Sequence, residues 1–199
     1  SLVANLITVS PGSQNNGGVR TGNGGATSLT YEDAQALSTS SQVTTLTNVS
    51  PELSRRTQVT TGATNTNTSI VGATPAYMTV HKTTVSEGVF VTTLDIDSLS
   101  KVAIIGPTTA LNLFPDGSDP VGQTVRINKI AFKIVGETAS KGGTGFGNQD
   151  DMIIIPLTTA QKLVFGVDYL SSIALAANDP NNIATTEDQV GYVLLARHH

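Results

Sequence analysis

The chain has 199 residues, of which 38% are hydrophobic and 13% charged, enough to bury one sizeable core or two smaller ones. Its net charge is −4 and its 11 lysines and arginines form no basic run, which argues against a nucleic-acid partner because such binding needs clustered cations. Since there is no cysteine, disulfides, thiolate metal sites and a cysteine nucleophile are excluded.

The first third of the sequence predicts one strand–helix–strand unit. Residues 2–9 are rich in strand-forming residues, and residues 13–26 are mostly glycine, asparagine and small residues, as in a loop. Thr30 and Asp33 have the spacing of a capping box, which predicts that a short helix begins there.

Residues 43–74 then predict two strands joined by a polar hairpin. They are rich in threonine, valine and asparagine, with the alternation of half-buried strands. The pattern is interrupted at Ser50-Pro51 and again at residues 65–67.

The middle of the chain predicts a strand, a helix and a hairpin. Residues 101–106 read as a buried strand, and Pro107 suits the first position of a short helix. Residues 116–120 form a turn cluster, and apolar residues alternate with polar ones over residues 125–134. Asn128-Lys129 divides this alternating run, so we expect a tight hairpin turn there.

The last third again predicts alternating strands and helices. Residues 152–156 form a fully apolar run typical of a buried strand, and residues 158–165 predict a helix that Gly166 ends. Residues 172–176 predict one more strand, and residues 178–180 supply a cap and a proline for a final helix. The inward residues of that helix should be Ile183, Val190, and Val193 or Leu194.

Two glycine-containing or acidic motifs resemble ligand sites but lack essential parts. In residues 141–147 the lysine precedes the glycines, whereas a phosphate-binding P-loop needs it after them, so we expect a loop. Asp95 and Asp97 begin like a calcium loop, but its sixth position is not glycine and its twelfth is Gly106 instead of glutamate. We therefore expect a solvated turn.

Three further motifs could be catalytic but are incomplete. Ser98–Lys101 fits S-x-x-K, but the helix start and the K-T-G strand of penicillin-recognising enzymes are missing. His81 could act as the base of a catalytic triad, but the sequence contains no G-x-S-x-G motif to supply the serine. Adjacent residues of an extended chain point to opposite faces, so Asp150 and Asp151 are expected in a solvated loop rather than as an acid–base pair. We predict no catalytic, cofactor-binding or metal-binding residue.

An ordered set of short segments resembles the periplasmic core domain of the MacB/FtsX-type ABC transporter permeases. The segments, which together span nearly the whole chain, are residues 5–9, 29–33, 49–51, 71–77, 113–114, 119–123, 132–136, 146–151, 155–161 and 195–198. There are two departures from the family pattern. Phe114-Pro115 replaces a Phe-Gly pair, and residues 87–90 read Glu-Gly-Val-Phe where a Gly-Arg-Phe-Phe element is usual.

The resemblance implies an α+β fold with a porter-like subdomain and an inserted, smaller mixed α/β subdomain called the sabre. We expect the porter-like subdomain in residues 1–84 and 141–199, and the sabre-like subdomain in residues 85–140. No apolar run approaches the ~20 residues of a membrane helix, and no signal-peptide pattern follows Ser1, so we expect an excised soluble piece.

The resemblance also implies a function. The domain would transmit ATP-driven movement of membrane helices to partners on the periplasmic or extracellular face of the bacterial cytoplasmic membrane, for efflux of antibiotics, peptides or lipids. The ATPase would be separate, reached through the membrane helices of a dimeric multi-pass permease. The other partners implied are a MacA-like membrane fusion protein and an outer-membrane channel. No cofactor is implied.

Three other functions stay open at this stage. They are a lipoprotein-sorting or hydrolase-activating permease of the same superfamily, a free-standing extracellular binding or adhesion module, and a serine hydrolase built on Ser98. If the segment joins two transmembrane helices, its ends should lie on one pole, so we expect Leu2 near Arg197.

Overall fold

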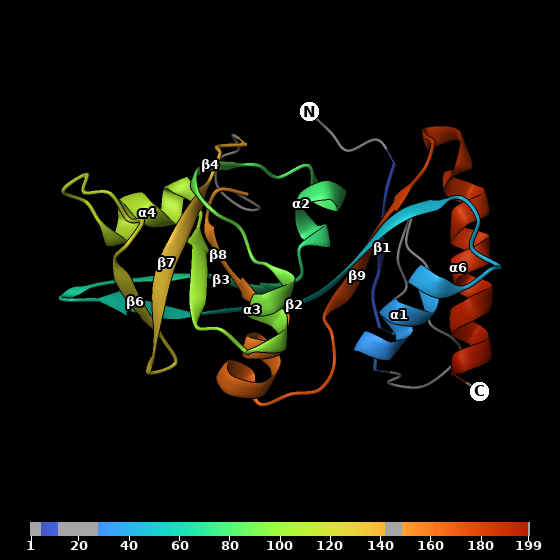
Figure 1. Cartoon of the computed structure of the whole chain (residues 1–199), viewed down its shortest axis with the longest axis horizontal. Coiled ribbons are helices and arrows are strands. Elements are labelled where there is room, and N and C mark those ends of the chain that lie inside the picture. The colour runs from blue at the N-terminus through green and yellow to red at the C-terminus, as the bar shows by residue number, and fades with distance from the viewer. Residues whose placement is uncertain (1–4, 12–27, 142–148, 199) are drawn as a thin grey trace. The chain divides into compact units, whose positions relative to one another are not determined.

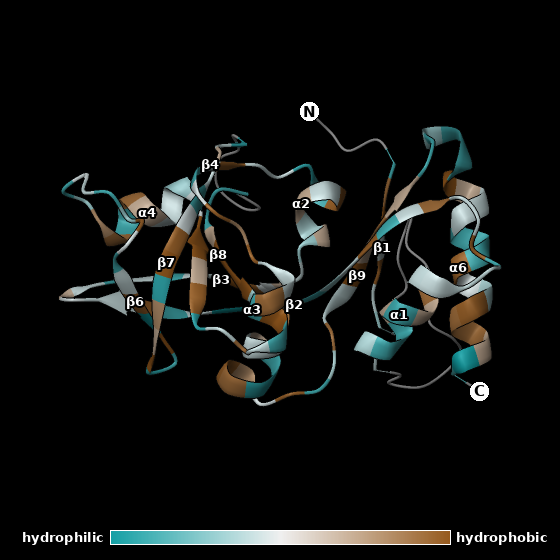
Figure 2. Ribbon diagram, in the orientation of Figure 1, coloured by the Kyte–Doolittle hydropathy of each residue, from teal (hydrophilic) through white to brown (hydrophobic). Residues whose placement is uncertain are grey.

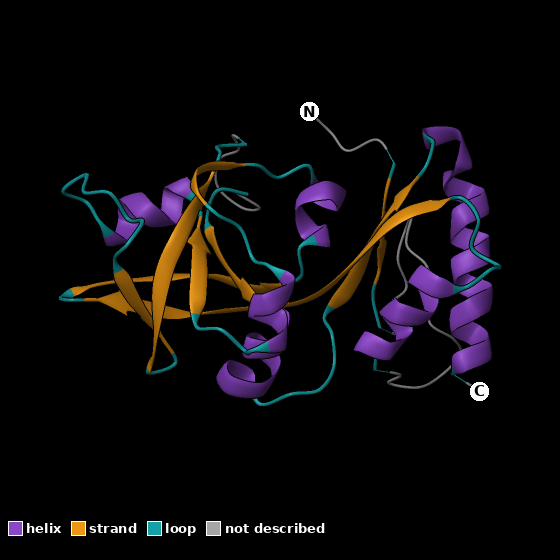
Figure 3. Cartoon of the chain, viewed as in Figure 1, coloured by secondary structure: helices purple, strands orange, loops and turns teal. Residues whose placement is uncertain are grey.

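The computed structural model describes residues 5–11, 28–141 and 149–198, and it is a mixed α and β fold, as the sequence predicts (Figure 3). The elements follow the chain in the order β1 (Leu6–Val9), α1 (Tyr31–Thr39), β2 (Leu46–Thr61), β3 (Thr64–Ala73), α2 (Ala76–His81), β4 (Val85–Gly88), α3 (Thr93–Asp97), β5 (Val102–Ile105), α4 (Pro107–Leu113), β6 (Thr124–Ile127), β7 (Ile130–Thr138), β8 (Met152–Pro156), α5 (Leu157–Thr159), the π-helix η1 (Ala160–Phe165), β9 (Ser172–Ala177), the 3₁₀ helix η2 (Pro180–Asn182) and α6 (Ile183–Arg197).

The chain forms two compact units. Unit 1 comprises residues 1–52, 76–82 and 168–199, and unit 2 comprises residues 53–75 and 83–167. These boundaries differ from the predicted ranges, because residues 53–75 and 141–167 group with the middle of the chain. The reason is strand pairing: β3 pairs in parallel with β8. Whether the units are porter-like and sabre-like stays a prediction.

Unit 1 is built on a three-stranded antiparallel sheet in the order β1, β9 and the first part of β2. Val80 of α2 packs against Ala174 and Ala176 of β9 on one face. Because successive side chains of a strand alternate, Ile173 and Leu175 face the other side, where α1 and α6 lie (Figure 1). Both faces of this small sheet are thus covered by helices.

Unit 2 is built on a closed ring of strands. The rest of β2 pairs with β3, β3 with β8, β8 with β5, β5 with β7, β7 with β6, and β6 with β2 again. A ring this small is filled by its inward side chains. All five residues of β8 are buried, and the strand is predominantly brown in Figure 2. Other fully buried side chains of the unit include those of Ile70, Ile104, Ile105, Ile127, Phe132 and Ile134.

Several predicted elements are confirmed. The capping box begins α1, with both of its hydrogen bonds present, and Pro107 is the first residue of α4. Asn128 and Lys129 both have positive φ, 50° and 69°, as a tight hairpin between β6 and β7 requires. The strands predicted over residues 2–9, 101–106, 152–156 and 172–176 correspond to β1, β5, β8 and β9. The loop predicted over residues 13–26 lies outside the described residues.

The predicted break in residues 43–74 is in the wrong place. β2 continues through Pro51, which is tolerated because this part of β2 is an edge strand of the unit 1 sheet. The hairpin turns at Gly62, whose φ of 55° suits glycine, instead of at residues 65–67, which lie within β3.

Two predicted helices also differ in detail. The helix predicted over residues 158–165 is mostly the π-helix η1, although Gly166 ends it in a left-handed conformation as expected. Asp179 and Pro180 begin η2 rather than α6. Within α6 the residues Val190, Val193 and Leu194 are buried as predicted, and Ile183 is half-buried. The elements α2, β4 and α3 were not predicted from the sequence.

The two chain ends were expected to lie close together. Leu2, one of the two residues named for this, lies outside the described residues. Leu6, at the start of β1, pairs with Ala176 near the end of β9, shortly before α6 begins. The 15 residues of α6 then carry the chain about 22 Å away, to Arg197. Leu6 therefore lies near the start of α6 and Arg197 at its end, and the expected placement of Leu2 near Arg197 stays a prediction. None of the helices in the described ranges is both long and apolar enough to span a membrane.

Candidate functional site

A buried charged group in the described residues is the Asp33 cluster, which we define as Thr30, Asp33, Arg197 and His198. Asp33 is in the first turn of α1 and is 1% exposed. The Thr30 backbone N–H donates to Asp33 Oδ2 over 3.0 Å, and the Asp33 N–H donates to the Thr30 hydroxyl over 3.3 Å. The capping box therefore holds the carboxylate in place at the start of the helix.

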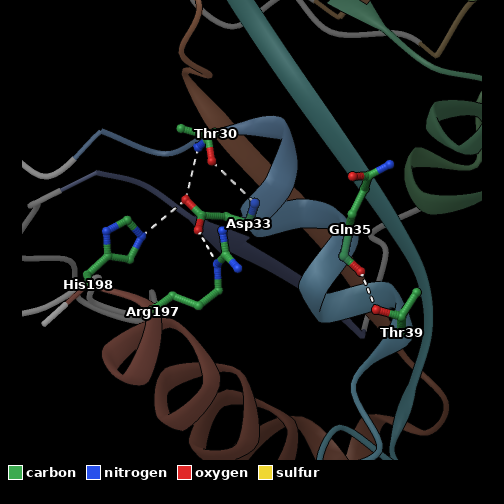
Figure 4. Close-up of polar contacts among 6 residues, drawn as sticks. All are labelled: Thr30, Asp33, Gln35, Thr39, Arg197 and His198. Carbon is green, nitrogen blue, oxygen red and sulfur yellow. Dashed lines mark hydrogen bonds and ion pairs between the residues drawn. The ribbon is translucent and has the colours of Figure 1, made fainter.

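The other two members of the cluster come from the end of α6. Arg197 Nε donates to Asp33 Oδ1 over 2.7 Å, and His198 Nε2 lies 3.1 Å from Oδ2 (Figure 4). Each carboxylate oxygen thus meets its own cationic or polar partner. The cluster joins the first turn of α1 to the last turn of α6.

The electrostatics of the Asp33 cluster favour the ionised carboxylate. Burial by itself raises the pKa of Asp33. The hydrogen bonds from Arg197 and Thr30, together with the positive charges of His198 and Arg197, outweigh burial and leave that pKa below its ordinary value of 3.8. The cluster can therefore tie two helices together at neutral pH, but it offers no free nucleophile or base.

A second polar group surrounds Glu52, the last residue of unit 1 on β2. Its Oε2 accepts a hydrogen bond from the Ser50 hydroxyl over 2.9 Å and lies 2.6 Å from His81 Nε2. The ring of Tyr77 packs against that of His81 with centroids 4.3 Å apart. Burial, and then the charge of Glu52, raise the pKa of Tyr77.

The Glu52 group does not have the geometry of a serine hydrolase. In such an enzyme the imidazole bridges the serine and the acid, whereas here the carboxylate bridges Ser50 and His81. Ser50 is also completely buried, so no substrate can reach its hydroxyl. His81 is thus placed in a structural network, with no elbow serine beside it.

Ser98 is placed unfavourably for a nucleophile of the S-x-x-K kind. It follows the last residue of α3 and its hydroxyl donates to the Leu94 carbonyl over 2.6 Å, whereas those enzymes start a helix at the serine. Asp95 also belongs to α3, where it closes a capping box with Thr92. The predicted solvated turn at Asp95 and Asp97 is therefore wrong, because this capping box begins a helix.

Asp150 and Asp151 are not in a solvated loop, and that prediction is wrong. Asp150 is 6% exposed and accepts hydrogen bonds from the Ser140 hydroxyl and the Lys141 backbone N–H over 2.7 and 2.8 Å. Asp151 accepts from the hydroxyls of Thr68 and Thr109 over 2.7 and 3.0 Å. The two carboxylates serve different partners, so they form no acid–base pair.

The glycine-rich segment that was compared with a P-loop is outside the described residues from 142 to 147, and only Lys141 can be placed. Across the described part of the chain, no group of three or more His, Cys, Asp or Glu side chains could hold a metal ion.

Comparisons with known proteins agree on one family over nearly the entire chain. The family described as MacB-like periplasmic core domain matches residues 1–192. Two relatives, both called macrolide export ATP-binding/permease protein MacB, come from Hyphomonas neptunium and Bdellovibrio bacteriovorus. They are 35% and 32% identical over 199 and 198 residues, which is 100% of this chain and 30% of each relative. The chain thus spans about 30% of the length of these curated relatives.

Solved structures show the same fold at lower identity. The periplasmic region of MacB from Actinobacillus actinomycetemcomitans superposes with a TM-score of 0.81 at 21% identity, covering 99% of this chain and 86% of the other. The extracellular domain of the noncanonic ABC-type transporter YknZ from Gram-positive bacteria gives 0.77 at 20% identity, covering 98% and 95%.

Proposed function

This chain belongs to the family of MacB-like periplasmic core domains, and we propose that it transmits ATP-driven movement of membrane helices to partners outside the cytoplasmic membrane. The transmitted movement would drive the efflux of antibiotics, peptides or lipids. The observation that carries the proposal is the family match over residues 1–192, combined with polar groups that tie elements of unit 1 to one another.

The Asp33 cluster is the part of this chain best suited to force transmission. It joins the start of α1 to the end of α6 through a buried carboxylate with a charged partner. A connection of this kind resists separation of the two helices, so unit 1 can move as a rigid body. Rigid-body hinge and shear movements are a common route by which packed units convey a change from one site to another.

We propose that ATP hydrolysis takes place outside residues 1–199, and that this chain is not itself an enzyme. The relatives are named as joint ATP-binding and permease proteins, and the present chain matches about 30% of their length. The proposed native protein is a multi-pass permease that works as a dimer, with this domain on the periplasmic or extracellular face. We also propose that unit 1 is the porter-like subdomain and unit 2 the sabre-like one.

The proposed partners are a MacA-like membrane fusion protein, an outer-membrane channel where the cell has one, and the nucleotide-binding domain through the membrane helices. A lipoprotein-sorting or hydrolase-activating permease of the same superfamily remains the alternative. Such a permease would transmit the same movement, but it would extract lipoproteins or activate a hydrolase instead of exporting a small molecule.

The proposed function can be tested in the full-length permease by replacing this domain with a flexible Gly/Ser linker. We expect ATP hydrolysis by the membrane-embedded protein to continue, while protection of the host cell against a macrolide is lost. Protection that survives the replacement would overturn the proposal. Unchanged drug protection combined with mislocalised lipoproteins would select the lipoprotein-sorting alternative. The full-length protein with Asp188→Asn, an exposed position on α6, is the matched control.

A further inference from the structure

Unit 2 contains an open pocket of about 470 Å³ that none of the polar groups described above uses. It lies beside α4, the loop after it, β4 and β7, elements that are labelled in Figure 1. We call it the α4 pocket. Its apolar lining comes from Pro107, Ala110, Leu111, Phe114 and Pro120, and its carboxylates come from Glu87, Asp119 and Glu137. The volume falls in the range of pockets that bind ligands or side chains.

The apolar lining of the α4 pocket combines a buried base with an exposed wall. Ala110 and Phe114 are 8% and 6% exposed, so they form a packed surface. Leu111, one residue further along α4, is 68% exposed. Large apolar side chains that are exposed beside a pocket indicate a contact surface wider than a small molecule would cover.

The three carboxylates of the α4 pocket face one another. The hydrogen bond with Asp119 raises the pKa of Glu87, with further contributions from burial and from the charges of Asp119 and Glu137. Burial, and then the charge of Asp119, raise the pKa of Glu137. The ion pairs found in the described residues involve Asp33 and Glu52, and none involves a carboxylate of this pocket. The pocket therefore presents negative charge over an apolar floor.

We propose that the α4 pocket docks a segment of a partner protein that inserts an arginine or lysine side chain next to an apolar residue. The aliphatic stem of such a side chain can lie on Leu111 and Phe114 while its cationic head meets the carboxylates. Arginine suits the site better than lysine, because its planar guanidinium can serve more than one carboxylate at once. The neighbouring apolar residue of the partner covers the exposed leucine.

This inference gives the chemistry of one partner and in that respect rests on the proposed transmission role. Its test uses the chain alone, so a negative result would leave the linker replacement in the full-length permease unaffected. Conversely, failure of the linker experiment would leave the pocket's ligand preference measurable.

The experiment is an NMR titration of the ¹⁵N-labelled chain with the capped peptide acetyl-Leu-Arg-Leu-amide. We expect shifts of amide signals to concentrate at residues 87, 108–114, 116–119 and 137. The matched peptide acetyl-Leu-Gln-Leu-amide should bind about tenfold more weakly, the effect of about 1.4 kcal/mol of lost charge interaction. The double variant Glu87→Gln, Glu137→Gln should weaken binding of the arginine peptide by about tenfold as well.

The control is the double variant Glu32→Gln, Glu187→Gln, which removes the same charge from unit 1 and should leave the affinity unchanged. Equal binding of the two peptides would overturn the proposal, as would full binding to the double pocket variant. A further probe is hexyltrimethylammonium, a small cationic amphiphile. If it shifts the same signals and the arginine peptide does not, the pocket binds small cationic amphiphiles, and the proposal of a protein partner is wrong. Absence of localised shifts with millimolar peptide would overturn docking altogether.

Discussion

Asp33 in unit 1 and the three carboxylates of the α4 pocket in unit 2 are used in opposite ways. In unit 1, Asp33 is buried and is paired with Arg197 and His198 of the same unit. In unit 2, Glu87, Asp119 and Glu137 line an open pocket, and none of them belongs to an ion pair found in the described residues. The difference shows that unit 1 uses its charge to hold its own helices together. The negative charge of the α4 pocket remains available to a cation from outside.

The largest expected effect comes from breaking the internal pair of unit 1. Asp33→Asn should lower the free energy of unfolding by about 2–3 kcal/mol, at the low end for a broken buried ion pair because the Arg197 side chain is 38% exposed. Urea unfolding followed by circular dichroism measures this value. The control Asp188→Asn, an exposed carboxylate on α6, should change it by less than about 0.5 kcal/mol. Equal effects of the two variants would mean that the Asp33 cluster does not stabilise unit 1.

The second prediction compares the capping boxes of the two units. Thr30 and Thr92 make the same pair of hydrogen bonds, to Asp33 in α1 and to Asp95 in α3. Thr30→Ala should lower the free energy of unfolding by about 1 kcal/mol, because it loosens the Asp33 carboxylate, which also holds α6. Thr92→Ala should lower the free energy of unfolding by about 0.5 kcal/mol, because α3 has only five residues and its capping hydrogen bonds are exposed. Thermal unfolding of both variants checks the order, and a larger loss for Thr92→Ala would contradict the comparison.

The third prediction concerns the pH dependence of the Asp33 variant. The folded state lowers the pKa of Asp33, so its ionised form contributes stability that is fully present above the ordinary value of 3.8. That contribution is lost as the pH falls through the lower folded pKa. The stability gap between the native chain and Asp33→Asn should therefore shrink as the pH falls below 3.8. Urea midpoints over a pH series measure it, and a gap that persists undiminished in strong acid would refute the charge-based explanation.

The smallest effect is expected in unit 2 and has the opposite sign. The folded state raises the pKa of Glu137 above 4.5, so its ionised form disfavours folding. Glu137→Gln should stabilise the chain at neutral pH by no more than about 0.5 kcal/mol, because solvent screens a partly exposed group. The gain should decline as the pH falls through the raised pKa and vanish below 4.5. Glu187→Gln is the control, and a loss of stability in Glu137→Gln at neutral pH would contradict the cost that burial and the charge of Asp119 impose on the ionised Glu137.

The sequence could predict one half of the Asp33 cluster. The spacing of Thr30 and Asp33 identifies a capping box, because both hydrogen bonds are local. Arg197 and His198 lie 164 and 165 residues further along the chain, and a single sequence gives no measure of which distant cation reaches a given carboxylate. The pairing follows from how α1 and α6 pack.

The same contrast between local and distant signals explains which other parts of the fold could be predicted from the sequence. Asn128-Lys129 was predicted correctly because a turn depends on the residues in it. Pro51 was misread as a break because its tolerance depends on β2 being an edge strand there, which is a property of the sheet. The α4 pocket was not predicted at all, because it collects residues from β4, α4 and β7 that no local pattern connects.

The most direct test of the proposed transmission is a distance measurement in the working transporter. Because residues 1–199 contain no cysteine, spin labels can be attached at Gln35→Cys and Asp188→Cys in a full-length permease whose other cysteines have been replaced. Pulsed electron spin resonance then compares the resting and ATP-bound states. We expect the distance between the two Asp188 positions of the dimer to change by several ångström, while the distance from Gln35 to Asp188 within one copy stays constant. An Asp188 distance that stays constant while ATP-driven export continues would contradict the account.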